Sequence, residues 1–185
     1  MRSIPDPGFS GDDGAASDAV TSALAAYQRD PDRRHAPTLS VLQHARLLVP
    51  VVAVLGEVAH DEHGLAHDKT SDMAAVLMRG RDGRTALLAF TSTEAMHRWD
   101  PQARPVPVPA ATAAAAAVQD GAAALLVDVA GPVLFVIEED DLRSLAEGYT
   151  LADLGGRYGW GKHHPSDIGG EPRRIRRGRH TDIGG

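Results

Sequence analysis

The chain of 185 residues is long enough for one domain with a hydrophobic core and too short for two large domains joined by linkers. It contains no cysteine, which excludes disulfides, thiolate nucleophiles and cysteine-bound metal centres, and only 4% of it is aromatic, so aliphatic side chains must fill the interior. The formal net charge of −6 is divided unevenly, because residues 149–185 hold seven Lys or Arg against four Asp or Glu, which is +3 and leaves −9 for residues 1–148.

The N-terminal part of the sequence predicts a tail followed by a helix. Residues 1–16 are rich in Gly, Asp, Ser and Pro and are expected to be disordered. Over residues 17–30, Val20, Leu24 and Tyr27 recur at helical spacing, with Ser17 or Asp18 as the N-cap. One amphipathic helix is therefore expected here.

A short helix and a buried strand are expected next. Thr38 to His44 is compatible with a second short helix. Arg46–Val58 is almost continuously apolar and rich in β-branched residues, as in a strand buried on both faces. Pro50 tempers this interpretation, since proline lacks the N–H that a sheet ladder uses and prefers an edge or a bulge.

Two β-hairpins are predicted from apolar runs that flank turn residues. Met73–Met78 and Thr85–Thr91 are joined by a segment that contains Asp82-Gly83, a strong hairpin signal. Ala124–Val129 and Val133–Ile137 are joined by Ala130-Gly131-Pro132 and form the second predicted hairpin.

The segment between the two hairpins predicts a helix and an extended stretch. Thr91 and Glu94 have the spacing of a capping box, which opens a helix that Pro101 ends. The proline-rich segment Arg104–Pro109 cannot be helical and is either a short edge strand or an extended connector.

Two further helices complete the predicted domain. An alanine-rich helix is expected to start at Thr112 and to end at Gly121. A second helix, with acidic residues in its first turn, is expected from Glu139 to Glu147, with Gly148 as its C-terminal cap. Hairpins alternating with helices indicate an α+β or mixed α/β fold. We expect one domain at residues 17–148 with its core at 38–148, followed by a flexible tail at 149–185 that is rich in Gly, Arg and His.

A histidine-rich segment is a candidate metal site. His60, His63 and His67 are spaced so that a helix would bring their imidazoles to one face, and imidazole is a good ligand for zinc. Gly64 and the position between two predicted strands instead favour a solvated connection. Both interpretations stay open, and no bound cofactor is expected.

Two further candidate sites lie on the predicted hairpins. Arg79, Arg81 and Arg84 surround the first turn and could together receive a phosphate or carboxylate, although charged hairpin tips are common. Asp128 stands in an otherwise apolar strand, and its burial would demand a partner such as an arginine or backbone donors. It either stabilises the turn or contributes to a ligand site.

The C-terminal tail contains a compact basic tract. Its arginines could follow the phosphates of RNA or DNA, while the acidic body of the protein opposes a polyanion. The alternative is a disordered basic end without a specific ligand. The arginines of this tract are Arg173, Arg174, Arg176, Arg177 and Arg179.

Several of these segments together resemble the N-terminal domain of the SseB family, the enhanced serine sensitivity proteins. The resemblance rests on the apolar strand, the two hairpins, the proline-rich segment and one tryptophan between them. The residues concerned are Leu48–Val58, Ser71–Met78, Gly80–Thr91, Trp99, Arg104–Pro109 and Ala122–Val136. The resemblance implies an α/β domain that acts by binding or regulation, and it supplies no catalytic residues.

The functional expectation is a non-catalytic regulatory or protein-interaction module with a protein partner. The sequence shows no combination of nucleophile, base and orienting group that would indicate an enzyme. Nucleic-acid binding through the tail is the alternative, and metal binding through the three histidines is a second one. The N-terminus lacks a signal pattern and no apolar run has the length of a membrane span, so a cytoplasmic protein without membrane contact is expected.

Overall fold

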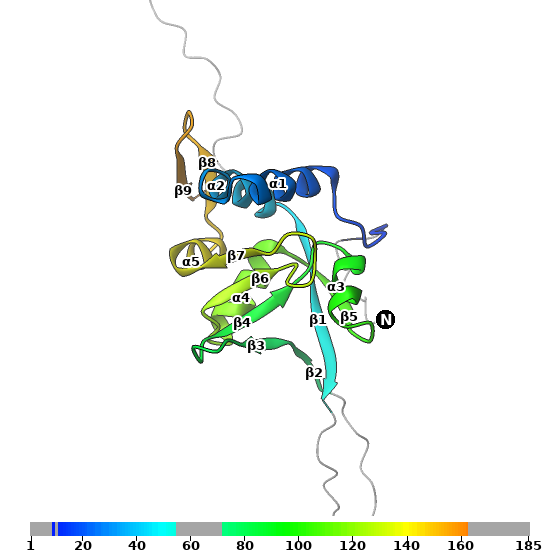
Figure 1. Ribbon diagram of the computed structural model, residues 1–185. Coiled ribbons are helices and arrows are strands. Elements are labelled where there is room, and N and C mark those ends of the chain that lie inside the picture. Colours follow the sequence, from blue (N-terminus) through cyan, green and yellow to red (C-terminus); the bar gives the residue numbers. More distant parts are fainter. Residues whose placement is uncertain (1–8, 10, 55–71, 163–185) are drawn as a thin grey trace, which may run out of the picture.

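A computed structural model describes residues 9, 11–54 and 72–162 (Figure 1). The described residues form five helices and nine short strands in a mixed α/β arrangement, which confirms the predicted fold class. In chain order the elements are α1 (Asp18–Arg29), α2 (Pro31–Leu42), β1 (Arg46–Val54), β2 (Asp72–Ala75), β3 (Leu77–Arg79), β4 (Thr85–Ala89), α3 (Thr93–Trp99), β5 (Arg104–Pro109), α4 (Ala110–Gln119), β6 (Ala124–Val127), β7 (Phe135–Glu138), α5 (Glu139–Ala146), β8 (Thr150–Asp153) and β9 (Tyr158–Gly161).

The first two helices follow each other with a single residue between them. Ser17, one of the two N-cap residues that the sequence predicts, caps α1 by accepting a hydrogen bond from the Val20 N–H. The second helix is longer than the predicted Thr38–His44, because it begins at Pro31. Asp30 accepts from the Arg33 N–H as the N-cap, and proline fits the first helical position, where no N–H is needed.

Part of the segment that the sequence assigns to a disordered N-terminal tail is held on the domain by Arg46. Its Nη2 lies 2.7 Å from Asp12 Oδ1 and donates to the Ala15 carbonyl, while its Nη1 donates to the Thr91 carbonyl. Residues 11–16 therefore form an ordered strap, which we call the N-terminal strap. The prediction that these residues are disordered is wrong. The guanidinium of Arg46 holds them on the domain, because it satisfies three acceptors at once.

Two sheets meet along β1. The four-stranded sheet has the order β3-β4-β6-β7, with β4 and β6 parallel and the two outer pairs antiparallel, and it contains both predicted hairpins. The first strand predicted for them, Met73–Met78, is divided in the structure: β3 pairs with β4, while β2 pairs with β1 in the other sheet. The three-stranded sheet has the order β2-β1-β5, so the proline-rich segment is a strand at an edge. Paired hydrogen bonds between Leu48 and Phe90 connect the two sheets.

Pro50 is tolerated inside β1 because it comes just after the residue of β1 that bonds to the other sheet. On one edge of β1, Leu48 bonds to Phe90, and two residues later the Pro50 carbonyl accepts from the Val76 N–H. The partner on this edge thus changes at Pro50, and the Val76 carbonyl, which an N–H at position 50 would face, accepts from the Leu88 N–H instead.

The larger hydrophobic core lies on one face of the four-stranded sheet. Leu87, Leu125 and Ile137 stand side by side across three strands and are fully buried. The alanine face of α4 and the leucines of α5 pack over them, while α1 and α2 close the top of the core in Figure 1. α4 begins at Ala110, two residues before the predicted start, and Gly121 follows it with a positive φ of 69°.

The chain continues past the predicted domain end into a small hairpin. The sequence assigns residues 150–161 to a flexible tail. This prediction is wrong for them, because β8 and β9 pair antiparallel. The side chain of Gln43 donates to the Leu151 carbonyl and accepts from its N–H, and Trp160 Nε1 donates to Asp141. A glycine-rich segment without its own core is ordered here by the side chain of Gln43, which directly follows α2, and by that of Asp141 in α5.

Candidate functional sites

The carboxyl ends of the parallel strands β4 and β6 place a threonine beside an aspartate. Thr91 follows β4 by one bridging residue, and Asp128 follows β6 directly. The Thr91 N–H donates to Asp128 Oδ1 over 2.8 Å, and the Thr91 hydroxyl donates to Oδ2 over 2.6 Å. Both residues are buried, with 5% and 2% of their surface exposed. The pair joins the two strand ends.

The backbone at Asp128 is unusual and depends on a nearby glycine. Asp128 has a φ of +57°, in the left-handed region that aspartate tolerates better than most residues. The Gly131 N–H donates to the Asp128 carbonyl, and a Cβ on Gly131 would lie 2.7 Å from the Asp128 Cβ. A glycine is therefore required at position 131 for this turn to close.

The structure corrects two expectations about this pair. Ser92, not Thr91, caps α3, since its side chain accepts from the Ala95 N–H. Thr91 is instead the partner that a buried Asp128 demands, and Asp128 lies after its strand, not within it. The sequence places both residues at the ends of apolar runs, but only the parallel pairing of those runs shows that they meet.

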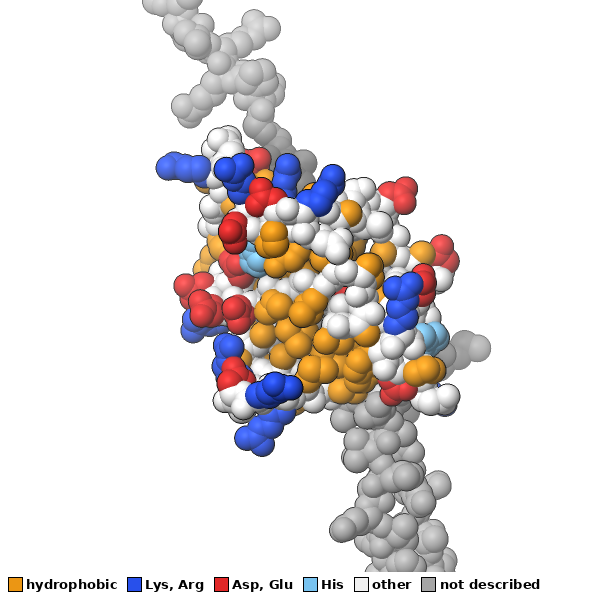
Figure 2. Space-filling view, viewed as in Figure 1, with side chains coloured by type: hydrophobic (Ala, Val, Ile, Leu, Met, Phe, Trp, Pro, Cys, Tyr) orange, Lys and Arg blue, Asp and Glu red, His pale blue; other side chains and the backbone are white. Residues whose placement is uncertain are grey.

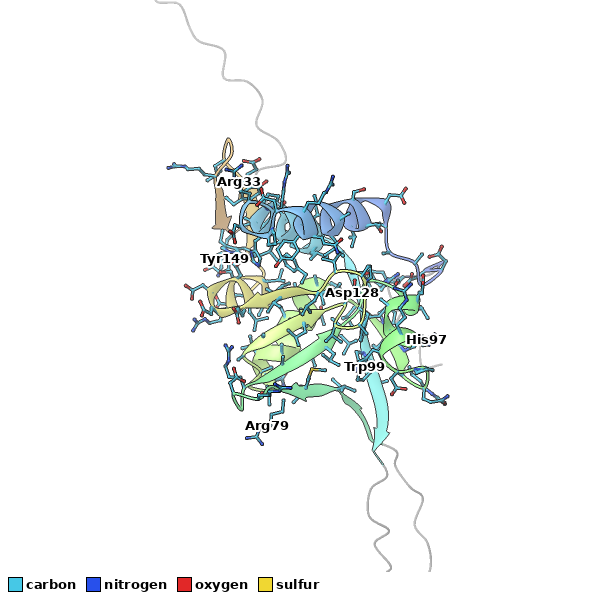
Figure 3. All side chains as sticks on the ribbon, viewed as in Figure 1. Arg33, Arg79, His97, Trp99, Asp128 and Tyr149 are labelled. Atoms are coloured by element: carbon cyan, nitrogen blue, oxygen red, sulfur yellow. The ribbon has the colours of Figure 1, made fainter. Side chains whose placement is uncertain are left out.

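A cavity of about 230 Å³ opens beside this pair. α1 supplies Leu24 and Ala25 to its wall, α3 supplies Ala95, and the loop after β6 supplies Val133. Figure 3 shows Asp128 between the four-stranded sheet and α1. Further lining groups include Ala16 of the N-terminal strap and the side chains of Thr21, Gln28, Thr91, Ser92, Glu94, Arg98, Asp128 and Pro132. We call this space the Asp128 cavity.

The charges around the cavity are unevenly compensated. At its rim, Arg98 and Glu94 form an ion pair with an N–O distance of 2.5 Å. The buried carboxylate of Asp128 has hydrogen bonds from Thr91 but no ion pair among the described residues. Burial raises the pKa of Asp128 above its ordinary value of 3.8, and the two hydrogen bonds from Thr91 offset only part of that rise.

This pKa has a direct consequence for stability. A carboxyl whose pKa is raised on folding binds its proton more tightly in the folded state, so its contribution to stability is fully present below the unfolded pKa and is lost as the pH rises through the folded pKa. We expect wild-type protein to lose stability relative to Asp128→Asn, which cannot titrate, as the pH rises from about 4 toward neutrality. Urea denaturation of both proteins across this range measures the difference. A difference that is constant, or that grows in favour of wild type with rising pH, contradicts the expectation.

The three arginines predicted as an anion site lie together at the β3–β4 hairpin but are not equivalent. All three are exposed. Arg84 is engaged, with its Nε 2.6 Å from Asp82 and its Nη1 3.6 Å from Glu138. The hydrogen bond from Arg84 lowers the pKa of Asp82. In Figure 3 Arg79 extends away from the sheet at this end. The hairpin therefore forms a positively charged edge of the four-stranded sheet, and its exposed arginines do not enclose an anion pocket.

Next to this edge, the second face of the four-stranded sheet is apolar and only partly covered. Figure 2 shows hydrophobic side chains gathered at the centre of this side, where Figure 1 places β3, β4 and β6. A hollow of about 200 Å³ there is lined by apolar side chains and by the Arg84–Glu138 pair. We define the open sheet face by four partly exposed residues of this hollow: Met78, Ala86, Leu126 and Val136.

The remaining predicted sites lie outside the described residues. This applies to His60, His63 and His67 and to the arginines of 173–179, whose metal and nucleic-acid roles stay predictions. Within residues 9, 11–54 and 72–162, no group of three or more His, Asp or Glu is arranged to hold a metal ion. None of the helices in the same residues is long and apolar enough to span a membrane.

The described residues form a mixed α/β domain. It has an open sheet face and a buried carboxylate, Asp128, at the carboxyl ends of its two parallel strands. Comparison with family models matches residues 20–144 to the SseB protein N-terminal domain. The matched region covers more than half of the chain, and the chain belongs to this family, as the resemblance of its hairpins implies. No curated protein and no solved structure gives a significant match.

Proposed function

We propose that this chain is a non-catalytic protein-interaction module whose open sheet face binds an apolar segment of a partner protein flanked by acidic residues. The observation that carries the proposal is a sheet with two apolar faces, of which helices cover only one completely. An apolar sheet face normally packs against a second layer, and a contiguous exposed apolar patch on a soluble domain commonly marks an interaction site.

The strand register gathers the apolar side chains on this face. Met78 stands beside Ala86 in the β3–β4 pair, and Leu88, Leu126 and Val136 form a neighbouring row across three strands. α3 covers the end of the face next to β1, where Met96 is buried and the ring of Trp99 lies 5.7 Å from that of Phe90. Leu88 is fully buried, whereas Met78, Ala86, Leu126 and Val136 remain partly exposed.

The local charge indicates which partner this face favours. The hairpin segment 79–84 holds three arginines and one aspartate, which is +2, or +1 together with Glu138, which pairs with Arg84, whereas residues 1–148 as a whole carry −9. A positive edge on an otherwise acidic body attracts carboxylates and disfavours further basic groups. The partner segment is therefore expected to place Asp or Glu beside its apolar anchors.

A phage-displayed library of random peptides, selected on the intact protein, tests the proposal. We expect the enriched peptides to combine apolar and acidic residues and to bind more weakly at higher salt. Val136→Asp should weaken their binding by about tenfold or more, because it buries a carboxylate against the apolar anchors. Val118→Asp is the matched control, since Val118 is 43% exposed on α4, outside the open sheet face.

A second variant keeps the apolar residues and changes only the charge. Arg79→Glu combined with Arg81→Glu alters exposed side chains, so it should leave folding intact and weaken the acidic peptides specifically. Peptides that are enriched in Lys or Arg, or that bind Val136→Asp as well as Val118→Asp, would show that the open sheet face is not the interaction site.

A further inference from the structure

We propose that the Asp128 cavity is a separate binding site for a small organic ammonium compound, whose cationic nitrogen the Asp128 carboxylate holds. The site is independent of the open sheet face. It would make the domain responsive to a small molecule as well as to a protein partner.

The position of the cavity is the first argument. β4 and β6 are parallel, and the cavity lies beyond their carboxyl ends, between α1 and α3. In open sheets with parallel strands, ligands are commonly bound outside the carboxyl ends of the strands, because the loops that follow the strands can supply side chains there. Thr91 and Asp128 are such side chains.

The chemistry of the lining is the second argument. Leu24, Ala95 and Val133 form apolar wall, and Asp128 brings a carboxylate that is 2% exposed. Thr91 donates one hydrogen bond to each carboxylate oxygen, and a carboxylate can accept about four in all. A ligand at this carboxylate must therefore supply donors, and an ammonium group supplies them together with a compensating charge.

The charge at the rim selects against the opposite class of ligand. Glu94 and Arg98 neutralise each other, so Asp128 determines the sign of the charge that a bound molecule meets. A carboxylate or phosphate in the cavity would face a buried like charge without a free cation beside it among the lining residues. The apolar walls and the volume of about 230 Å³ favour a compact aliphatic amine.

The test uses three probes of similar shape and different charge. The full chain, labelled with ¹⁵N, is titrated with 3-methylbutylammonium, with the uncharged 3-methylbutan-1-ol and with 3-methylbutanoate, and amide shifts are followed by NMR. The Thr91 amide is the central reporter, because its N–H donates to Asp128. We expect saturable shifts of Thr91 and the cavity walls with the ammonium compound, at a Kd about tenfold or more below that of the alcohol, and no saturable shift with the carboxylate.

Two variants on the exposed side of α1 locate the binding. Ala25 is exposed and lines the cavity, so Ala25→Trp should block it and raise the Kd by about tenfold or more. Ala19 is exposed on the same helix and does not line the cavity, so Ala19→Trp should bind as wild type does. Asp128→Asn should remove the preference for ammonium over alcohol, and the two tryptophan variants keep the test decisive if this one fails to fold.

Three results would each overturn the inference. The first is that the ammonium compound causes no saturable shift. The second is that the alcohol or the carboxylate binds as tightly as the ammonium compound does. The third is that Ala25→Trp binds the ammonium compound as tightly as wild type does.

Discussion

Replacing Phe135 with alanine is expected to lower the free energy of unfolding by about 3–5 kcal/mol, the range measured for buried phenylalanines in other proteins. Phe135 is fully buried at the start of β7. Its ring stacks on that of His35 with centroids 4.8 Å apart and meets the ring of Tyr27 edge-on at the same distance. The substitution removes the side chain that connects the sheet to both N-terminal helices and leaves a cavity among them.

The neighbouring residue provides the control for this prediction. Leu134 is 44% exposed, so Leu134→Ala should change stability by no more than about 0.5 kcal/mol. Urea denaturation followed by circular dichroism measures both. A loss of less than about 1 kcal/mol for Phe135→Ala would mean that the contacts among Phe135, His35 and Tyr27 do not stabilise the domain.

Asp128→Ala is expected to cost about 2–4 kcal/mol at neutral pH. It leaves the buried N–H and hydroxyl of Thr91 without an acceptor, and it forces alanine into the left-handed backbone region. Relief of the buried charge offsets part of this loss, because burial raises the pKa of Asp128. The loss should therefore be smaller at neutral pH than the hydrogen bonds alone would indicate.

Substitutions of Thr91 separate the two hydrogen bonds. Thr91→Ser keeps the hydroxyl and the N–H, so it should retain most of the stability, while Thr91→Val removes only the hydroxyl donor and should cost about 1–3 kcal/mol. A double-mutant cycle of Thr91→Val with Asp128→Asn measures the coupling between the side chains. Additive effects would contradict a direct interaction between them, since contacting residues are expected to show coupling of about 0.5 kcal/mol or more.

Features that depend on neighbours in sequence were predicted correctly. The two hairpins follow from apolar runs around short turns, and Ser17, one of two candidates for the cap of α1, follows from local hydrogen bonding. The proline-rich segment Arg104–Pro109 was limited by its missing N–H groups to an edge strand or a connector, and it is a strand at an edge. Such signals involve residues within one turn or one strand, so the sequence contains all of their participants.

Features that depend on a distant partner were missed or placed wrongly. Thr91 satisfies the spacing of a helix cap, yet it is bonded to a residue 37 positions away, and Ser92 takes the cap. Both residues 11–16 and residues 150–161 are glycine-rich, but Arg46 and Gln43 hold them on the domain through hydrogen bonds. Composition indicates that these segments lack a core of their own, and it does not indicate what they pack against.

The sequence by itself determined the family, the mixed α/β class, both hairpins and the need for a partner at Asp128, because each is contained in local patterns of apolar, turn and capping residues. Only the tertiary structure decided that β4 and β6 are parallel, which brings Thr91 to Asp128 and opens the cavity beside them. It also decided which face of the sheet the helices cover and which they leave open. The physical reason is that strand pairing and helix docking minimise exposed apolar surface over the whole chain, so their outcome depends on contacts between residues far apart in sequence.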